Sequence, residues 1–152
     1  MSTMDMKYDL HSALGYQLTL AARHAERRFE RALQGLGLTR ITWCVALAVG
    51  GHGLDHPSDI AGYVGVDRTA VSRALRSLAR DGLVVRKQGQ EDGRTRLVRL
   101  TESGKERLRA ANTLAIAARD RLETLLDSPE RAQLRAILLK LQKVDELPLG
   151  RI

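Results

Sequence analysis

The sequence has a single cysteine and lacks long apolar runs, and both absences narrow the class of protein. Cys44 has no second cysteine to pair with, which excludes an intrachain disulfide and favours a cytoplasmic location. The N-terminal stretch MSTMDMKYDLHS has no apolar signal core, and no uninterrupted apolar run reaches membrane-spanning length. Internal repeats and low-complexity tracts are also missing. We therefore expect no membrane partner.

Sequence patterns of catalysis are missing as well. The chain has no clustered acid pair, glycine-rich phosphate loop or nucleophile motif, and its serine, histidine and aspartate residues are scattered. His52 and His56 have the i, i+4 spacing of metal ligands, but the glycines around His52 disfavour a helix that presents both rings. We expect no enzyme, no catalytic residue, no cofactor and no metal site.

Positive charge is present in excess and is concentrated in one stretch. The formal net charge is +7 and the sequence pI is about 10.2. Residues 67–99 hold nine basic and four acidic side chains, so this stretch alone carries +5. A localised excess of this kind favours a polyanionic partner. With 43% hydrophobic residues in 152, the chain is expected to fold as one domain, or as a small domain with a dimerisation extension.

Apolar spacing predicts long helices at both ends of the chain. Steps of three and four indicate a first helix over residues 9–33, and Thr39 opens a second, buried helix. Thr101 caps a long helix with a heptad-like seam, formed by Leu108, Ala111, Ala115, Ala118, Leu122 and Leu125. Ser128 and Pro129 start a last helix, whose apolar face holds Leu134, Ile137, Leu138, Leu141 and Val144. The centre is too small to bury these stripes, which predicts a symmetric dimer of interleaved terminal helices.

The middle of the chain predicts a helix-turn-helix between residues 57 and 81. With Pro57 as the first position, Ala61 is fifth, Gly65 ninth and Val71 fifteenth. The fifth position needs a small side chain where two helices cross, and the ninth needs glycine for a turn with positive φ. On the second helix, the residues not needed for packing are Arg68, Thr69, Ser72, Arg73 and Arg76. They are expected to contact DNA, with Arg73 suited to bidentate contact with guanine.

Beyond Gly82 the hydrophobic period changes from 3.6 to 2, which predicts a β-hairpin. The segments LVVRKQ and RLVRLT alternate around the tip GQEDGRT. A hairpin directly after a recognition helix is a wing, whose tip lies near the adjacent minor groove. We expect Arg94 to enter that groove, with its guanidinium oriented by a charge-assisted hydrogen bond to Asp92. Arg86 and Arg96 are expected to contact phosphates.

The ordered segments LTRITW, IAGYVGVDRTAVSRALRSLARDGLVVR and DGRTRLVRLTESG resemble the multiple-antibiotic-resistance regulator (MarR) family of bacterial winged-helix repressors. The family's wing pattern, Asp-x-Arg followed by Leu-Thr-x-x-Gly, matches Asp92, Arg94, Leu100, Thr101 and Gly104. The resemblance covers residues 10–145. Gly93 stands where the family often has a basic residue, which makes the wing tip more flexible.

The resemblance implies a homodimer that binds pseudo-palindromic operator DNA, usually as a repressor released by a ligand or an oxidant. The expected fold is mainly α with a small β-hairpin, a winged helix-turn-helix between terminal dimerisation helices. We assign residues 1–36 to N-terminal dimerisation, 37–101 to DNA binding and 102–152 to C-terminal dimerisation. A small aromatic or anionic effector is expected in the family's cleft between these regions, with His11, Tyr16, His24 and Trp43 as candidates.

Two alternatives share the fold. Cys44 could make the chain an oxidant-sensing repressor, but its apolar neighbours Trp43, Val45 and Leu47 would raise the thiol pKa, which favours an inert core cysteine. The chain could also be a winged-helix module that binds another protein. The concentration of charge at groove-facing positions favours DNA instead.

Overall fold

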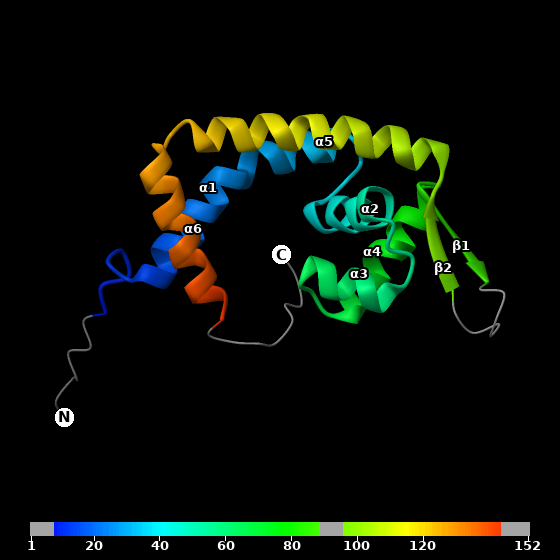
Figure 1. The fold of residues 1–152 in the computed structure, drawn as a ribbon, viewed down its shortest axis with the longest axis horizontal. Coiled ribbons are helices and arrows are strands. Elements are labelled where there is room, and N and C mark those ends of the chain that lie inside the picture. The colour runs from blue at the N-terminus through cyan, green and yellow to red at the C-terminus, as the bar shows by residue number, and fades with distance from the viewer. Residues whose placement is uncertain (1–7, 89–95, 144–152) are drawn as a thin grey trace, which may run out of the picture.

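The computed structural model describes residues 8–88 and 96–143, and it has helices on both sides of one hairpin, as predicted (Figure 1). In chain order the elements are α1 (Leu14–Gly35), α2 (Arg40–His52), α3 (Pro57–Val64), α4 (Arg68–Arg80), β1 (Val84–Gln88), β2 (Arg96–Leu100), α5 (Glu102–Glu123) and α6 (Ser128–Gln142). The helices α2, α3 and α4 gather with the hairpin at one end of the molecule. From there α1 and α5 run alongside each other to the far end, where α6 turns back.

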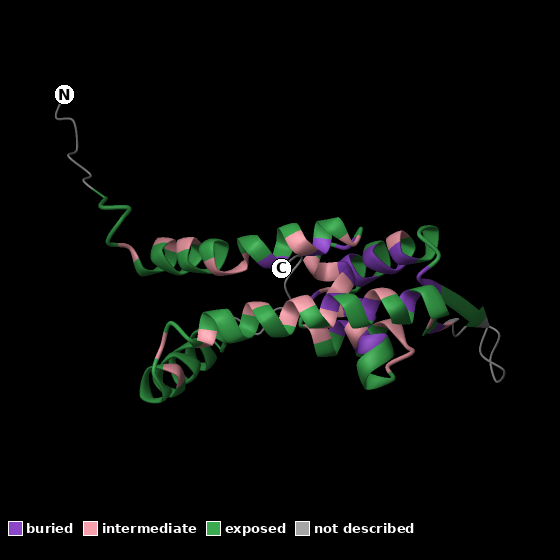
Figure 2. Ribbon diagram, turned by 90° about the horizontal axis from the view of Figure 1, so that it is seen from above, coloured by how far each residue is buried: buried purple, intermediate pink, exposed green. Residues whose placement is uncertain are grey.

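The hydrophobic core lies in the unit formed by α2, α3, α4 and the hairpin. Buried residues concentrate in this unit and in the adjoining ends of α1 and α5 (Figure 2). The largest fully buried side chains are Leu33, Val45, Ile60, Val66, Val71, Leu75, Leu78 and Val98. The helix α2 is central because its apolar residues face α3 and α4 on one side and α5 on the other. This confirms the prediction of a buried second helix.

Polar side chains define where the helices of this unit begin. Thr39 forms a capping box with Thr42 at the start of α2, and the Asp67 carboxylate accepts from the Ala70 N–H at 2.7 Å at the start of α4. Both interactions satisfy backbone donors that have no partner inside the helix. Gly65 has φ 78° between α3 and α4, the left-handed conformation predicted for this turn.

The hairpin is antiparallel and is attached to the rest of the unit by main-chain bonds. Its register pairs Val84 with Leu100 and Gln88 with Arg96. The Val98 N–H donates to the Asp55 carbonyl at 2.9 Å, which fixes β2 to the segment between α2 and α3. The buried side chains of Val84 and Val98 hold the hairpin on the core.

Thr101 and Gly104 join the hairpin to α5. The Thr101 N–H donates to the Leu83 carbonyl at 3.0 Å, and its hydroxyl donates to the Gly82 carbonyl at 2.7 Å. The same hydroxyl accepts from the Gly104 N–H at 3.0 Å and so caps α5, as predicted. A Cβ at Gly104 would overlap the Leu83 carbonyl. The Leu-Thr-x-x-Gly pattern therefore brings the start of α5 against the backbone that leads into β1.

The first helix begins at Leu14, five residues later than predicted. Asp9 accounts for the difference, because its carboxylate accepts from the His11 N–H at 3.1 Å and its carbonyl from the Ser12 hydroxyl at 3.2 Å. These local bonds form a turn that competes with helix for the same backbone groups. The predicted apolar stripe is buried only at its C-terminal end, where Phe29 and Leu33 reach the core.

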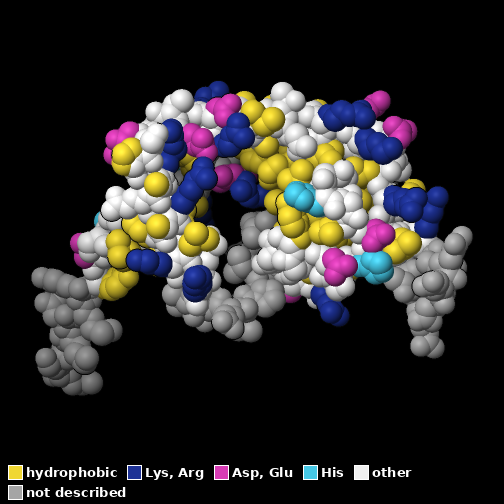
Figure 3. Space-filling model, in the orientation of Figure 1, with side chains coloured by type: hydrophobic (Ala, Val, Ile, Leu, Met, Phe, Trp, Pro, Cys, Tyr) yellow, Lys and Arg dark blue, Asp and Glu magenta, His cyan; other side chains and the backbone are white. Residues whose placement is uncertain are grey.

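The terminal helices expose apolar side chains at the end far from the core. In α6 no described residue is buried, and the outward apolar side chains are Leu134, Ile137, Leu138, Leu139 and Leu141. Apolar side chains spread over α6 in the view of Figure 3. The α5 seam changes along its length, because Leu108 and Ala111 are buried while Leu125 is 73% exposed. One chain alone therefore leaves the predicted stripes uncovered.

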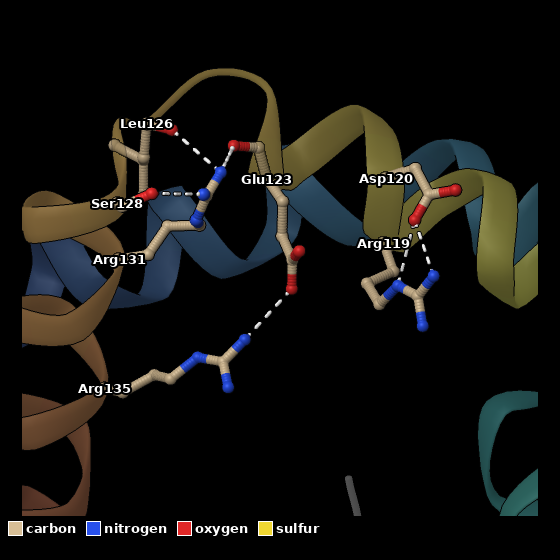
Figure 4. A network of polar contacts seen from close by, with 7 residues as sticks. All are labelled: Arg119, Asp120, Glu123, Leu126, Ser128, Arg131 and Arg135. Carbon is tan, nitrogen blue, oxygen red and sulfur yellow. Dashed lines mark hydrogen bonds and ion pairs between the residues drawn. The ribbon is translucent and has the colours of Figure 1, made fainter.

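Arginines fix the corner between α5 and α6 (Figure 4). The Arg131 guanidinium donates to the carbonyls of Glu123 and Leu126 at 2.8 and 3.1 Å, and also to the Ser128 hydroxyl at 2.9 Å. Arg135 pairs with the Glu123 carboxylate at 3.0 Å. Because Arg131 bonds the last carbonyl of α5 and a carbonyl of the connection that follows, it sets the direction in which α6 leaves.

Within the described residues, no single helix has the length and hydropathy to cross a membrane; only α1 and α2 taken together, across a 73° bend, pass by length and composition.

Candidate nucleic-acid interface

The α4 helix has one buried and one exposed face, and the exposed face carries the cations. Ala70, Val71, Ala74, Leu75 and Leu78 are buried against the core. The predicted contact residues of this helix are all exposed, namely Arg68, Thr69, Ser72, Arg73 and Arg76. The sharp separation of the two faces is typical of a helix that rests on a core and presents its other side to a partner. The structure thus brings these five residues together on one surface.

The arginines of this face differ in their surroundings. The Arg76 side chain donates to the Ser72 carbonyl at 3.4 Å, which directs it along the helix. Arg68 and Arg73 have no hydrogen bond or ion pair to other residues within the described segments. Arg80, at the end of α4, pairs with Asp81 at 3.3 Å and with the Ser77 hydroxyl at 3.1 Å. Arg68 and Arg73 can therefore turn toward a partner without breaking such a bond.

The hairpin adds exposed basic side chains beside α4. Arg86 and Lys87 are both exposed. Residues at alternate positions of a strand share a face, so Arg86 lies on the same face as the buried Val84. The strand β1 is in contact with α4, which precedes it in the chain. Basic side chains also gather over the hairpin and the first turns of α5 (Figure 3).

The predicted contact residues of the wing tip are Asp92, Arg94 and Arg96. Asp92 and Arg94 lie outside the described residues, and Arg96 is described by its backbone alone, paired with Gln88 at the end of the hairpin. Their roles at the wing tip stay predictions.

A groove of about 640 Å³ lies between α1 and α5, and its walls are mostly apolar. It is lined by Ala21, His24, Ala25, Arg28, Phe29, Ala32, Leu114, Ala117, Ala118, Arg121, Leu122 and Leu125. His24, Arg28 and Arg121 are the polar members of this lining. Their side chains have no hydrogen bond or ion pair to other described residues. The groove can accept an apolar body with an anionic edge.

Of the four effector candidates, only His24 lines the groove. His11 and Tyr16 stack edge to face with ring centroids 5.6 Å apart, near the exposed start of α1. Trp43 lies behind the groove wall, with its ring 4.9 Å from that of Phe29, and its indole N–H donates to Asn112 Oδ1 at 3.0 Å. Arg28 and Arg121 line the groove as well, and no local pattern could predict this because they lie on α1 and α5, which are far apart in the sequence.

Cys44 is half-buried on α2. Burial raises the pKa of its thiol, although nearby Arg40 lowers it and Glu26 raises it further. A raised pKa leaves less of the reactive thiolate near neutral pH. This agrees with the interpretation of an unreactive cysteine.

The two histidines with metal-like spacing face different partners. His52 Nε2 lies 2.7 Å from the Tyr63 hydroxyl, and His56 Nδ1 lies 2.6 Å from the Asp55 carboxylate. Among the described residues, no three His, Cys, Asp or Glu side chains are grouped as metal ligands would be. His52 and His56 thus contact different residues and do not share a partner.

Arg107 of α5 contacts the α1–α2 connection. Its guanidinium donates to the Leu36 carbonyl, 71 residues away in the chain. Arg40 pairs with Glu26, and so joins the start of α2 to α1. No local pattern marks such contacts, because their partners are distant in sequence.

Comparison with known proteins agrees with this geometry. The family model described as MarR family matches residues 36–95, from the α1–α2 connection through the hairpin tip. The uncharacterized HTH-type transcriptional regulator YdgJ of Bacillus subtilis (strain 168) is 43% identical over 54 residues. That match covers 36% of this chain and 33% of YdgJ, so it spans only about a third of the relative's length.

Solved structures match over most of the chain. A cysteine-to-serine mutant of MarR from E. coli, complexed with operator DNA, is 25% identical with a TM-score of 0.75. The match covers 84% of this chain and 92% of that one. The organohalide-sensing transcriptional regulator RdhR, in its 2,4-dichlorophenol-bound form, reaches a TM-score of 0.82 over 96% of this chain and 90% of that one. Its identity is 16%, so this likeness concerns the fold alone.

Proposed function

From the premise that this chain belongs to the MarR family of winged helix-turn-helix transcriptional regulators, we propose that it is a homodimeric repressor. It binds a pseudo-palindromic operator in double-stranded DNA and acts by occluding a promoter in the cytoplasm. Residues 37–101 bind DNA, and residues 1–36 and 102–152 form the dimer. Its relatives are described as transcription regulators, and the chain is not an enzyme.

The observation that carries this proposal is the cationic, exposed face of α4 beside a basic hairpin. The N-terminal half of a recognition helix reaches base edges in the major groove. Thr69 and Arg73 lie in that half, and the Arg73 guanidinium suits bidentate contact with guanine. We propose that Ser72 and Arg76 meet bases or phosphates at the rim, and that Arg86 contacts phosphate. Arg68 contacts the DNA backbone near the N-terminus of α4, where the helix dipole also favours a phosphate.

The wing adds a second set of proposed DNA contacts. We propose that Arg94 enters the flanking minor groove, where Asp92 orients it, and that Arg96 contacts phosphate. A narrow minor groove has concentrated negative potential, which attracts an inserted arginine. In a symmetric dimer the two recognition helices then occupy half-sites about 10 base pairs apart, centre to centre.

Exposed apolar side chains on the terminal helices support the dimer. Leu134, Ile137 and Leu138 project from α6 without being buried in the chain itself. Burial of apolar surface contributes about 25 cal/mol per Å², so a second copy that covers these side chains would stabilise both. Their place at the end opposite the recognition helices leaves α4 free for DNA.

A small aromatic or anionic effector would bind in the α1–α5 groove. The apolar walls would hold a ring, and His24, Arg28 and Arg121 would meet an anionic edge. RdhR, of the same fold, was solved with 2,4-dichlorophenol. Such an effector releases DNA only if it binds one dimer shape more tightly than the other. Among the other candidates, Trp43 would respond through Phe29, whereas His11 and Tyr16 lie away from the groove.

Selection of bound duplexes from a random DNA pool tests the proposed function. The wild type should enrich a pseudo-palindrome, and the Arg73→Ala variant should relax preference at one position of each half-site. Loss of one bidentate contact should lower discrimination there by about 1–3 kcal/mol. Equal loss on all sequences would demote Arg73 to a phosphate contact, and no enrichment at all would favour a protein-binding module.

An oxidant-sensing repressor is the second candidate, with Cys44 as the one cysteine of the chain that an oxidant could modify. If oxidant still releases the operator from the Cys44→Ser variant, this candidate is excluded. If oxidant releases only the wild type, Cys44 is the sensor.

A further inference from the structure

Besides the packing of Leu108 and Ala111 on the core, the DNA-binding unit is hydrogen-bonded to α5 or its N-cap at two separate places. One is the base of the hairpin, where Thr101, the N-cap of α5, donates to the carbonyls of Gly82 and Leu83 and accepts from the Gly104 N–H. The other lies 11 residues further along α5, where Asn112 accepts the Trp43 indole N–H at 3.0 Å. At 1.5 Å per helical residue the two places are about 16 Å apart. Hydrogen bonds at two separated places limit rotation of the DNA-binding unit relative to α5 more than bonds at one place would.

Asn112 is an unusual residue for its position on α5. Its neighbour Ala111 is fully buried, and Leu108, Leu114 and Ala115 pack on the core from the same helix. Asparagine has a poor helix propensity, and a half-buried amide needs partners. Trp43 offers one, because an indole N–H can only donate. A lone polar contact in an apolar contact region specifies geometry more than it adds stability.

We infer that the Trp43–Asn112 hydrogen bond sets the separation of the two recognition helices, and with it the half-site spacing that the dimer accepts. Both are positioning residues, and neither touches DNA. A shift of about 3.4 Å along the duplex is a whole base-pair step, so a small rotation of the unit on α5 changes which spacing fits. This inference rests on the proposed dimeric, DNA-binding function.

The same contact lies next to the effector groove. Phe29 lines the groove, and its ring packs edge to face on Trp43 at 4.9 Å. The guanidinium of Arg40, which pairs with Glu26, lies over the Phe29 ring with its central carbon 5.9 Å from the ring centroid. Phe29 is therefore the one side chain between an occupant of the groove and the Trp43–Asn112 hydrogen bond.

Distance measurement between spin labels tests the inference without DNA. On a Cys44→Ser background, Arg80→Cys places one label at the exposed end of each α4 in the dimer. Asn112→Leu removes the acceptor and should broaden or displace the interlabel distance distribution. Asn112→Asp keeps an acceptor oxygen at the same place and should restore the wild-type distribution. Thr113→Ala is the neighbouring control, since the Thr113 hydroxyl bonds only its own helix at the Arg109 carbonyl.

Duplexes with half-sites moved apart or together by one base pair give the second readout. Asn112→Leu should lower the ratio of affinities between the best and the shifted spacing by up to about tenfold, the range of one neutral hydrogen bond. A merely structural role would weaken binding equally at every spacing. Far-UV circular dichroism and thermal unfolding confirm that each variant is folded.

The outcomes separate the two proposals. Unchanged distances and an unchanged spacing ratio in Asn112→Leu overturn the inference while the wild type still binds DNA. If the labelled wild type gives an interlabel distance but binds no DNA, only the proposed function is refuted. The spin-label distances of Asn112→Leu then still test the inference. A monomeric wild type overturns both.

Discussion

At the scale of single residues, Gly104 is constrained by the backbone next to it rather than by its own conformation. It lies in the first turn of α5, and the Leu83 carbonyl occupies the space that a side chain would need. Thr101 supplies the hydrogen bonds that hold the two segments this close. The glycine at the end of the wing pattern thus has a steric cause.

Gly104→Ala should therefore lower the free energy of unfolding by about 3 kcal/mol, because the methyl group must displace backbone. Urea unfolding followed by circular dichroism measures the loss. Gly62→Ala is the matched control, since a Cβ there meets nothing within 4 Å and alanine has the better helix propensity, a gain of up to about 1 kcal/mol. Equal stability of the two variants would contradict the steric account.

Cys44 should react slowly with alkylating agents in the folded protein. Burial raises the pKa of its thiol, so the thiolate fraction at pH 8 is below that of a free cysteine. The stabilising effect of the neutral thiol is complete below the ordinary pKa and is lost as pH rises through the raised one. Mass spectrometry after iodoacetamide treatment, with and without urea, measures the rates. Equal rates in the folded and unfolded chain would argue for a reactive thiol.

At the scale of elements, α4 is defined by its ends. Asp67 accepts the Ala70 N–H at 2.7 Å, and Gly82 follows its last turn with φ 70°. Both ends were predictable from the sequence, because capping residues act on backbone groups next to them. The first and last turns in turn place the exposed arginines relative to the core.

Asp67→Ala should cost about 1 kcal/mol of stability and loosen the first turn of the recognition helix. Asp67→Asn removes the same charge but keeps a capping oxygen, so the difference between the two variants isolates the cap. Thermal unfolding and operator affinity are the measurements. If both variants lose equal stability, the carboxylate acts through its charge and not as a cap.

Local patterns also predicted the hairpin and the starts of α2, α5 and α6, but not the contacts between elements. Periodicity states which face of a helix is apolar, and it cannot state which residue of another element meets that face. Trp43 and Asn112 are 69 residues apart, and Arg107 and Leu36 are 71 apart. The groove cations Arg28 and Arg121 were missed for the same reason. The late start of α1 came from side-chain bonds of Asp9 that compete with the helix.

At the scale of the whole molecule, the cationic surface and the exposed apolar side chains of the terminal helices lie at different ends. The cationic surface lies on α4 and the hairpin, whereas α6 and the start of α1 expose apolar side chains such as Leu14, Leu18 and Ile137. The long helices α1 and α5 connect the two (Figure 1). A change in how two copies pack at the apolar end would thus move the recognition helices at the other.

Ile137→Glu should convert the dimer to a monomer, because it places a charge among side chains that a second copy would cover. Ala136→Glu, on the opposite side of α6, should leave the dimer intact. Sedimentation over a range of protein concentrations measures both, and the monomeric variant should lose at least most of its operator affinity. Identical sedimentation of the two variants would remove α6 from the interface.

The most direct measurement is a hydroxyl-radical footprint of the wild type on its selected operator. We expect two symmetric protected segments on one face of the duplex, about 10 base pairs apart centre to centre, each flanked by minor-groove protection from a wing. A single protected segment, or uniform protection along the duplex, would contradict this expectation.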